Sequence, residues 1–233
     1  MRMITKKTKD SGFNFNTGEV ILVDKEKGFT SFDVIAKLRR ILKIKKIGHA
    51  GTLDPLATGL LIICTGRKTK EIYHYQDLNK KYSGVITLGK STPTMDSETD
   101  FIEEKNFDNV TTEKIFDVRD TFLGKISQIP PMYSAVKHKG KALYKYARKG
   151  IEIKREPKEV FISKFDILKT DLPDILFEID CSKGTYIRVI ADDFGKKLGC
   201  GAYLKNLRRE RIGEYSVEDA FTIEEFTQFI NSN

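Results

Sequence analysis

The sequence predicts an α+β fold, in which helices flank a mixed and largely antiparallel sheet. The first observation is that strand-like and helix-like segments do not alternate regularly along the chain, as they would in a doubly wound sheet. The second is that 39% of the 233 residues are hydrophobic, which is enough to bury a sizeable core. At 233 residues the chain suits one large domain or two small ones, and no repeat, low-complexity tract or obvious linker divides it. Our prediction is a single domain over residues 1–233, with a polar leader at 1–17.

Hydrophobic periodicity places the elements of the N-terminal part. Residues 18–24 alternate weakly and predict a strand, and Ser31 then stands where a helix N-cap is expected. The apolar face of that helix consists of Val34, Ile35, Leu38, Ile41 and Leu42. Residues 60–64 are continuously apolar, so they predict a short strand buried on both faces. A strand at 82–88 and a helix at 112–122 follow.

The C-terminal part contains the remaining predicted elements. Residues 186–198 have the spacing of an amphipathic helix. Thr222 and Glu225 form a capping box, which predicts the start of a last helix. Strands are expected at residues 160–168, 175–181, 200–207 and 211–217.

Basic charge is concentrated in one segment. The chain has 41 lysines and arginines against 33 aspartates and glutamates, a net charge of +8. Residues 137–158 hold nine basic and two acidic residues, which accounts for most of this excess. Tyr133, Tyr144 and Tyr146 lie in or beside the segment, and interleaved basic and aromatic residues can neutralise phosphates and stack on unpaired bases. The segment predicts either an RNA-binding surface or an ordinary solvated helix.

Composition also bears on location and redox state. No apolar run approaches the ~20 residues of a membrane span, and residues 1–13 lack the apolar core of a signal peptide. Cys64, Cys181 and Cys200 are odd in number and widely spaced, which fits neither a disulfide framework nor a zinc site. We therefore expect a cytoplasmic protein with buried free thiols.

Motifs for nucleotide and metal binding are incomplete. Residues 66–69 read Gly-Arg-Lys-Thr, which departs from the phosphate-binding loop, and residues 199–204 break the dinucleotide fingerprint. His49, His74 and His138 lack the spacing of metal ligands. We expect no cofactor and no metal.

Asp54 is the candidate reactive group. It lies in the segment GHAGTLDPLATG, residues 48–59, whose glycines permit close backbone approaches. Pro55 keeps Asp54 out of helical geometry, and the buried strand at 60–64 would hold the turn in place. From these residues alone, the segment predicts either a displayed catalytic carboxylate or an ordinary Asp-Pro turn.

Four segments resemble, in family order, blocks of the TruB family of tRNA pseudouridine synthases. They are residues 48–59, quoted above, 80–100 (KKYSGVITLGKSTPTMDSETD), 128–150 (QIPPMYSAVKHKGKALYKYARKG) and 181–209 (CSKGTYIRVIADDFGKKLGCGAYLKNLRR). The resemblance implies the pseudouridine synthase fold in a single catalytic domain. It identifies residues 128–158 as an inserted, thumb-like basic loop that closes on an RNA hairpin. Because the sequence stops at Asn233, we expect no C-terminal RNA-binding domain of the PUA type, which bacterial relatives commonly carry.

The resemblance assigns three catalytic roles. Asp54 matches the catalytic aspartate, and Arg188 matches the arginine whose charge keeps that aspartate ionised. Tyr82 matches the tyrosine that stacks on the target base and relays a proton. An ordinary structural ion pair is the alternative for Arg188, and without the resemblance Tyr82 would be interpreted as a core residue.

The resemblance also implies residues that bind the substrate. His49, Tyr186 and Leu207 match residues that hold the RNA hairpin or line the uridine pocket, although ordinary packing would explain them equally well from the sequence alone. Contacts with the RNA backbone are expected from Lys137, Lys139, Lys141, Lys145 and Arg148.

The implied reaction is the isomerisation of uridine to pseudouridine in the T-arm loop of tRNA, at the position conventionally numbered 55. The base is flipped out, detached from C1′, rotated and rejoined through C5, which requires no cofactor. The expected partner is the T-arm stem-loop of tRNA, and we expect a monomer with neither an obligatory protein partner nor a membrane. Two alternatives stay open: a non-catalytic module that binds or refolds tRNA, and a pseudouridine synthase that acts on another RNA.

Overall fold

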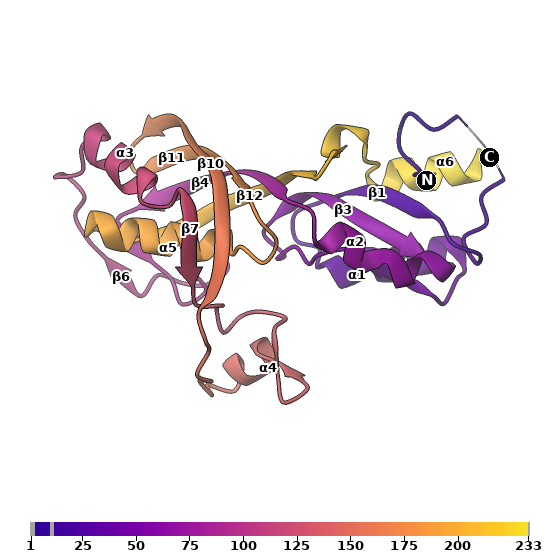
Figure 1. The fold of residues 1–233 in the computed structure, drawn as a ribbon, viewed down its shortest axis with the longest axis horizontal. Coiled ribbons are helices and arrows are strands. Elements are labelled where there is room, and N and C mark those ends of the chain that lie inside the picture. Colours follow the sequence, from indigo (N-terminus) through magenta and orange to yellow (C-terminus); the bar gives the residue numbers. More distant parts are fainter. Residues whose placement is uncertain (1–2, 10–11, 233) are drawn as a thin grey trace. The chain divides into compact units, whose positions relative to one another are not determined.

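The computed structural model describes residues 3–9 and 12–232, which divide into two compact units (Figure 1). Unit 1 contains the residues up to 82 and those from 207 onward, and unit 2 contains residues 83–206. Strands β4 (Lys80–Leu88) and β12 (Ala202–Ile212) contribute residues to both units. Each unit combines helices with strands of a mixed, largely antiparallel sheet, which confirms the predicted α+β class.

The sheet of unit 1 has the strand order β1–β3–β12. Strand β1 (Val20–Lys25) pairs antiparallel with β3 (Thr58–Thr65), whereas β3 runs parallel to β12. The short strands β2 (Ile47–His49) and β13 (Tyr215–Ser216) pair antiparallel with β3 and β12, respectively. Strand β3 therefore has paired neighbours on both sides and forms the centre of this unit.

Helices cover the sheet of unit 1. They are α1 (Ser31–Leu42), η1 (Gly66–Glu71), α2 (Ile72–Gln76), η2 (Val217–Asp219) and α6 (Ile223–Asn231). Leu61 and Ile63 pack with residues of α1 and α6 in one hydrophobic cluster, while Leu60 and Ile62 pack with Tyr75 of α2 in a second. These four residues of β3 are fully buried, two on each face of the strand, which confirms the prediction of a strand covered on both faces.

Unit 2 has the strand order β12–β4–β11–β10–β7. The antiparallel strands are β10 (Lys158–Asp171), β11 (Asp174–Cys181) and β7 (Gly124–Gln128), and the helices are α3 (Thr112–Asp120) and α5 (Ile187–Leu198). The core contains a cluster of the aromatic rings of Phe122, Phe165, Phe177 and Phe194, with centroids 5.8–6.2 Å apart. Phe194 belongs to α5, so this cluster packs the helix at whose start two of the predicted site residues lie.

Two smaller hairpins complete unit 2. Strand β5 (Lys90–Ser91) pairs with β6 (Glu103–Glu104), and β8 (Lys137–His138) pairs with β9 (Lys141–Ala142). The second hairpin and α4 (Tyr144–Ala147) belong to the segment of residues 129–157, which extends away from the ends of β7 and β10 (Figure 1). We call this segment the basic insertion.

The structure differs from the prediction at two element boundaries. Thr30, not Ser31, caps α1: the Thr30 hydroxyl accepts a hydrogen bond from the backbone N–H of Asp33 at 3.1 Å. In the C-terminal part, the predicted strands at 200–207 and 211–217 are mostly one continuous strand, β12. The gap between the two predicted strands contains Arg208 and Arg209, which pair with Thr58 and Gly59 of β3 and so continue the strand.

The described residues of the leader belong to the core of unit 1. Ile4 is fully buried and exchanges backbone hydrogen bonds with Val20 and Leu22 at 2.8 and 3.0 Å. Phe13 and Phe15 pack against the cluster that contains α1 and α6. The polar composition of residues 1–17 does not reveal these three apolar side chains. Ile4 forms a bridge with Ile21 of β1, the strand at the edge of the sheet.

Candidate functional site

Asp54 lies in the turn between β2 and β3, as predicted. The backbone N–H of Ala57 donates to the carbonyl of Asp54 at 3.1 Å, which closes the turn. The next carbonyl, that of Pro55, accepts from the N–H of Gly28 at 2.8 Å and from the buried Nζ of Lys25 at 3.5 Å. The backbone on the C-terminal side of Asp54 is therefore held by the chain that follows β1.

The N-terminal side of the turn is held by α1. The Ser31 hydroxyl accepts from the N–H of Leu53 at 2.9 Å and donates to the Leu53 carbonyl at 3.3 Å. Ser31 is fully buried in the first turn of the helix. Ser31, which was predicted to cap the helix, thus fixes the residue before Asp54 instead, and Thr30 is the N-cap of α1.

Arg209 holds the turn from β12. Its guanidinium donates to the carbonyl of Leu60 at 2.7 Å and to the carbonyl of Gly51 at 3.1 Å, and its side chain is only 1% exposed. Gly59 has a φ of +104°, and a Cβ there would lie 2.4 Å from the carbonyl oxygen of Arg209. This close approach requires glycine, and it lets β12 run directly against the start of β3.

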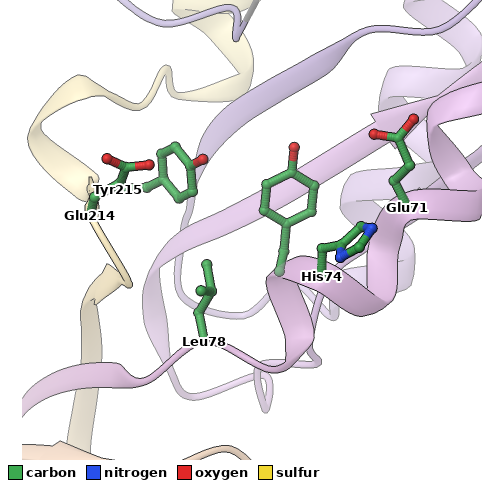
Figure 2. Close-up of a pocket in the computed structure, with 6 residues that line it drawn as sticks. Glu71, His74, Leu78, Glu214 and Tyr215 are labelled. Carbon is green, nitrogen blue, oxygen red and sulfur yellow. The ribbon is translucent and has the colours of Figure 1, made fainter. Parts of the chain in front are cut away.

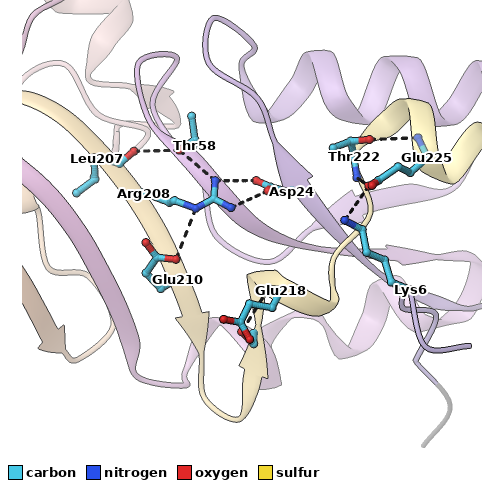
Figure 3. A network of polar contacts seen from close by, with 10 residues as sticks. Lys6, Asp24, Thr58, Leu207, Arg208, Glu210, Glu218, Thr222 and Glu225 are labelled. Carbon is cyan, nitrogen blue, oxygen red and sulfur yellow. Dashed lines mark hydrogen bonds and ion pairs between the residues drawn. The ribbon is translucent and has the colours of Figure 1, made fainter.

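Arg208, the neighbour of Arg209, ties the same strands together (Figure 3). It forms a two-pronged ion pair with Asp24 of β1, at 2.7 and 3.1 Å, and donates to the Thr58 hydroxyl at 3.4 Å. The Thr58 hydroxyl in turn donates to the carbonyl of Leu207 at 3.5 Å. Sequence reasoning missed both arginines as supports of the turn, because their partners lie about 150 or more residues away along the chain.

His49 is the last residue of β2 and lies half-buried beside the turn. Its ring meets the ring of Phe32 edge-to-face, with centroids 5.5 Å apart. Burial lowers the pKa of His49, and the charge of Arg209 lowers it further against a smaller opposing effect of the Gly51 backbone. Within the described residues, the buried Nδ1 atom has no hydrogen-bond partner. The imidazole is therefore favoured in its neutral form near pH 7.

Tyr82 and Leu207 are the other predicted site residues of unit 1. Tyr82 is a buried residue of β4, and Leu207 is a buried residue of β12 whose carbonyl faces Thr58 at the start of β3. Unit 1 therefore contains His49, Asp54, Tyr82 and Leu207. His49 ends β2, and Asp54 lies in the short connection that follows to the paired strand β3.

Tyr186 and Arg188 lie at the start of α5 in unit 2. Tyr186 is the N-cap of α5, and Arg188 is 4% exposed, with its guanidinium 5.9 Å from the Tyr186 ring. The Arg188 guanidinium donates to the carbonyls of Tyr133 and Thr94, the latter at 3.5 Å. The charge partnership expected between Arg188 and Asp54 stays a prediction, since the two residues belong to different units.

Two buried polar residues of unit 2 were missed by sequence reasoning. The Gln128 side chain accepts from the N–H of Tyr186 at 3.0 Å and donates to its carbonyl at 3.2 Å, so the end of β7 fixes the start of α5. Asp96 is 1% exposed and accepts from the Thr94 hydroxyl at 2.6 Å, in the loop that also contacts Arg188. A buried glutamine or aspartate has no distinctive local pattern that would have revealed either contact.

The basic insertion presents charge on a small folded segment. Lys137, Lys139, Lys145 and Arg148 are exposed and Lys141 is partly exposed. Lys141 lies over the Tyr146 ring at 4.8 Å, and Arg148 lies over the Tyr144 ring at 5.4 Å. Leu143, which directly precedes Tyr144, is buried, at 1% exposure. The surface therefore combines cations with aromatic rings, as the sequence predicts.

A separate cavity of about 530 Å³ lies in unit 1 (Figure 2). It is lined by Glu71, His74, Tyr75, Leu78, Glu214 and Tyr215. These residues follow the C-terminal ends of the parallel strands β3 and β12, whereas the Asp54 turn precedes β3. A strand of this length spans about 25 Å, so the cavity is not part of the Asp54 site.

Other site types find no support in the described part of the chain. No cluster of three or more His, Cys, Asp and Glu side chains there has the geometry to hold a metal ion. None of its helices combines the length and the apolar character that crossing a membrane requires. The three cysteines are buried and unbridged, as predicted, and burial raises the pKa of the Cys64 thiol to about 12.

Comparison with known proteins gives concordant matches. A family model described as the N-terminal domain of the TruB family of pseudouridylate synthases matches residues 39–187. A second, described as the C-terminal domain of tRNA pseudouridylate synthase B, matches residues 188–233. Together they account for the chain from the last turns of α1 to its end.

Individual proteins resemble the chain over most of its length. It is 47% identical over 218 residues to a protein of Chloroherpeton thalassium named tRNA pseudouridine synthase B, covering 91% of this chain and 90% of the relative. A protein of the same name from Parabacteroides distasonis is 45% identical over 226 residues, covering 94% and 96%. Among solved structures, a chain of a Cbf5-Nop10-Gar1 complex superposes with a TM-score of 0.71 at 28% identity, over 97% of this chain and 60% of that one.

Proposed function

Because the chain belongs to the TruB family of pseudouridylate synthases, we propose that it converts uridine to pseudouridine in tRNA, at position 55 of the T-arm loop. The observation that carries the proposal is the Asp54 turn, which buried side chains and backbone groups hold on each side. We further propose that residues 1–233 act as one catalytic domain, as a monomer and in the cytoplasm, where tRNA is modified.

Asp54 provides the charge that the reaction needs. When the bond between uracil and C1′ breaks, positive character develops on the sugar, and a carboxylate can stabilise this charge or capture the sugar as a nucleophile. Such stabilisation is most effective when the group is already fixed, because no reorganisation is then required during the reaction. The hydrogen bonds to Gly51, Leu53 and Pro55 support this role, since they fix the backbone around Asp54.

The other proposed residues act around the flipped base. Arg188 keeps Asp54 ionised, because a nearby cation favours the charged form of a carboxylate. Tyr82 stacks on the uracil and relays a proton from the sugar. His49, Tyr186 and Leu207 line the pocket or hold the hairpin. Extruding a base costs a few kcal/mol, and each aromatic stack returns roughly 1–3 kcal/mol, so these side chains can offset the cost.

We assign binding of the RNA backbone to the basic insertion. Lys137, Lys139, Lys141, Lys145 and Arg148 contact the phosphates of the T-arm. Neutralising phosphates releases counterions, which makes binding dependent on salt but not on sequence. Specificity for the T-loop then comes from the pocket rather than from the insertion.

Release of tritium from tRNA labelled at uridine C5 tests the proposal, because bonding at C5 expels the hydrogen there. We expect release by the wild-type protein, none by Asp54→Asn, and none from tRNA whose uridine 55 is replaced by cytidine. Tight tRNA binding without release would favour the non-catalytic module. Release that persists without uridine 55 would indicate a different RNA position or a different RNA.

A further inference from the structure

Phe32 is an apolar side chain in a place where packing does not require one. Its side chain is 70% exposed, the largest fraction among the large hydrophobic residues that the structure describes. It is the second residue of α1, a position in the first helical turn where polar or acidic residues are favoured. The helix buries Val34, Ile35 and Leu38 instead, so the core does not account for Phe32.

Phe32 lies against His49 and beside the Asp54 turn. The rings of Phe32 and His49 are 5.5 Å apart at 84°, within the range of an attractive edge-to-face pair. The residue before Phe32, Ser31, is hydrogen-bonded to Leu53, which is the residue before Asp54. The position of Phe32 relative to the turn is therefore fixed by two hydrogen bonds and one ring contact.

Most of the Phe32 ring remains available for another contact. Phe32 is 70% exposed as a residue while its ring meets that of His49, so there is room for a second aromatic ring against it. Flat, sequence-tolerant stacking is how aromatic side chains bind unpaired nucleobases. His49 is half-buried and favoured in its neutral form, so the pair presents aromatic surface without an added charge.

We propose that Phe32 is a base-stacking residue of the RNA site, which receives the nucleobase next to the extruded uridine while its ring braces His49. This inference rests on the proposed function, because it assumes that RNA is extruded at the Asp54 turn. Phe32 does not touch the reacting atoms. Its loss should weaken RNA binding and raise KM, and it should leave the chemical step intact.

Fluorescence of a T-arm stem-loop tests the stacking directly. The stem-loop carries 2-aminopurine on the 5′ or the 3′ side of the target uridine, and Asp54→Asn serves as the background to prevent turnover. Stacking on Phe32 should quench one of the two labels on binding. Phe32→Ala should remove this quenching and weaken binding by about five- to a hundredfold, the size of one base stack.

Three matched variants separate stacking from structure. Phe32→Tyr keeps an aromatic face and should retain both quenching and affinity. Phe32→Leu keeps an apolar side chain without a ring and should behave like Phe32→Ala. This result would exclude a role in packing alone, because leucine preserves apolar packing but cannot stack. Tyr73→Ala removes another exposed aromatic residue that packs on a histidine, His74 at 4.0 Å, beyond the far end of β3, and should leave binding unchanged.

Tritium release measured in parallel distinguishes this inference from the proposed function. Active wild-type protein together with a Phe32→Ala variant of unchanged KM and quenching would overturn the stacking role and leave the function standing. Quenching that depends on Phe32 in a protein that releases no tritium would support stacking and overturn the isomerase activity. Unchanged salt dependence in Phe32→Ala is expected, because a stack neutralises no phosphate.

Discussion

The Asp54 turn is held from β12, from α1 and from the chain after β1, whereas the basic insertion is joined to unit 2 mainly at its two ends. In the turn, the carbonyls of Gly51, Leu53 and Pro55 each accept a hydrogen bond from a buried side chain. In the insertion, the lysines and arginines are mostly exposed, and Leu143 is a small buried anchor. Chemistry at a single atom requires a fixed group, while a grip on phosphates requires charge within reach. The difference between the two regions therefore fits the two roles that we propose for them.

Removing the Arg209 side chain should loosen the Asp54 turn and destabilise the protein. Arg209→Met keeps much of the apolar stem but leaves the buried carbonyl of Leu60 and the partly buried carbonyl of Gly51 without this donor. Each unsatisfied buried group is costly, so we expect a loss of about 2–4 kcal/mol in the free energy of unfolding, measured with urea. The rate of tritium release should fall as the turn loosens.

Arg211 provides the matched control for Arg209. It is an exposed arginine two residues along β12, with a hydrogen bond to the carbonyl of Glu214. Arg211→Met should change the free energy of unfolding by less than about 1 kcal/mol. Equal losses in both variants would show that the buried guanidinium has no special role in the turn.

Reversing charge in the basic insertion should affect binding alone. With Lys139, Lys141 and Lys145 replaced by glutamate, we expect tRNA affinity to fall about ten- to a hundredfold and the slope of log affinity against log salt to decrease by about two. Binding titrations at several salt concentrations measure both.

The control replaces three exposed lysines of unit 2 outside the insertion with glutamate: Lys114, Lys164 and Lys169. An equal effect of the two triple variants would remove the insertion from the contact surface.

The pKa of His49 adds a smaller effect, on stability. Its pKa in the folded protein lies below the ordinary value of 6.5 because of burial and the charge of Arg209. Between the two values the unfolded chain binds a proton that the folded chain does not, so stability rises with pH through this window. The contribution is fully present above pH ~6.5 and is lost as the pH falls through the folded value.

His49→Gln should therefore flatten the dependence of stability on pH. Urea unfolding at several pH values between 5 and 7.5 measures this, with His74→Gln as the control from the same unit. A wild-type protein and a His49→Gln variant with the same rise in stability over this range would contradict the buried, neutral imidazole.

Elements whose pattern depends on residues close together in the sequence were predicted well. The continuous apolar run at 60–64 gave a fully buried strand, and the Thr222 and Glu225 pair gave the capping box of α6 at 3.1 and 2.7 Å. The turn at Asp54 also follows from its own residues, because Pro55 excludes helical geometry there. These features depend on neighbours within a few residues.

Long-range contacts were not predictable from the sequence. Serine is a residue type favoured at N-caps, yet the Ser31 hydroxyl forms its hydrogen bonds with the backbone of Leu53, 22 residues away. Arg209 and Gln128 are polar side chains that composition would place at the surface, and both are buried because distant carbonyls satisfy them. The sequence therefore predicted a candidate reactive residue, Asp54, but not the contacts that hold its turn in place.

A single-turnover measurement tests the division of roles most directly. Tritium release is followed with enzyme in excess over C5-labelled tRNA, for Asp54→Asn and for the glutamate variant of Lys139, Lys141 and Lys145. At saturating enzyme, the insertion variant should regain the wild-type rate within about threefold, while Asp54→Asn should stay at least about a thousandfold slower at every concentration. Turnover by Asp54→Asn at a rate near that of the wild type would contradict the account.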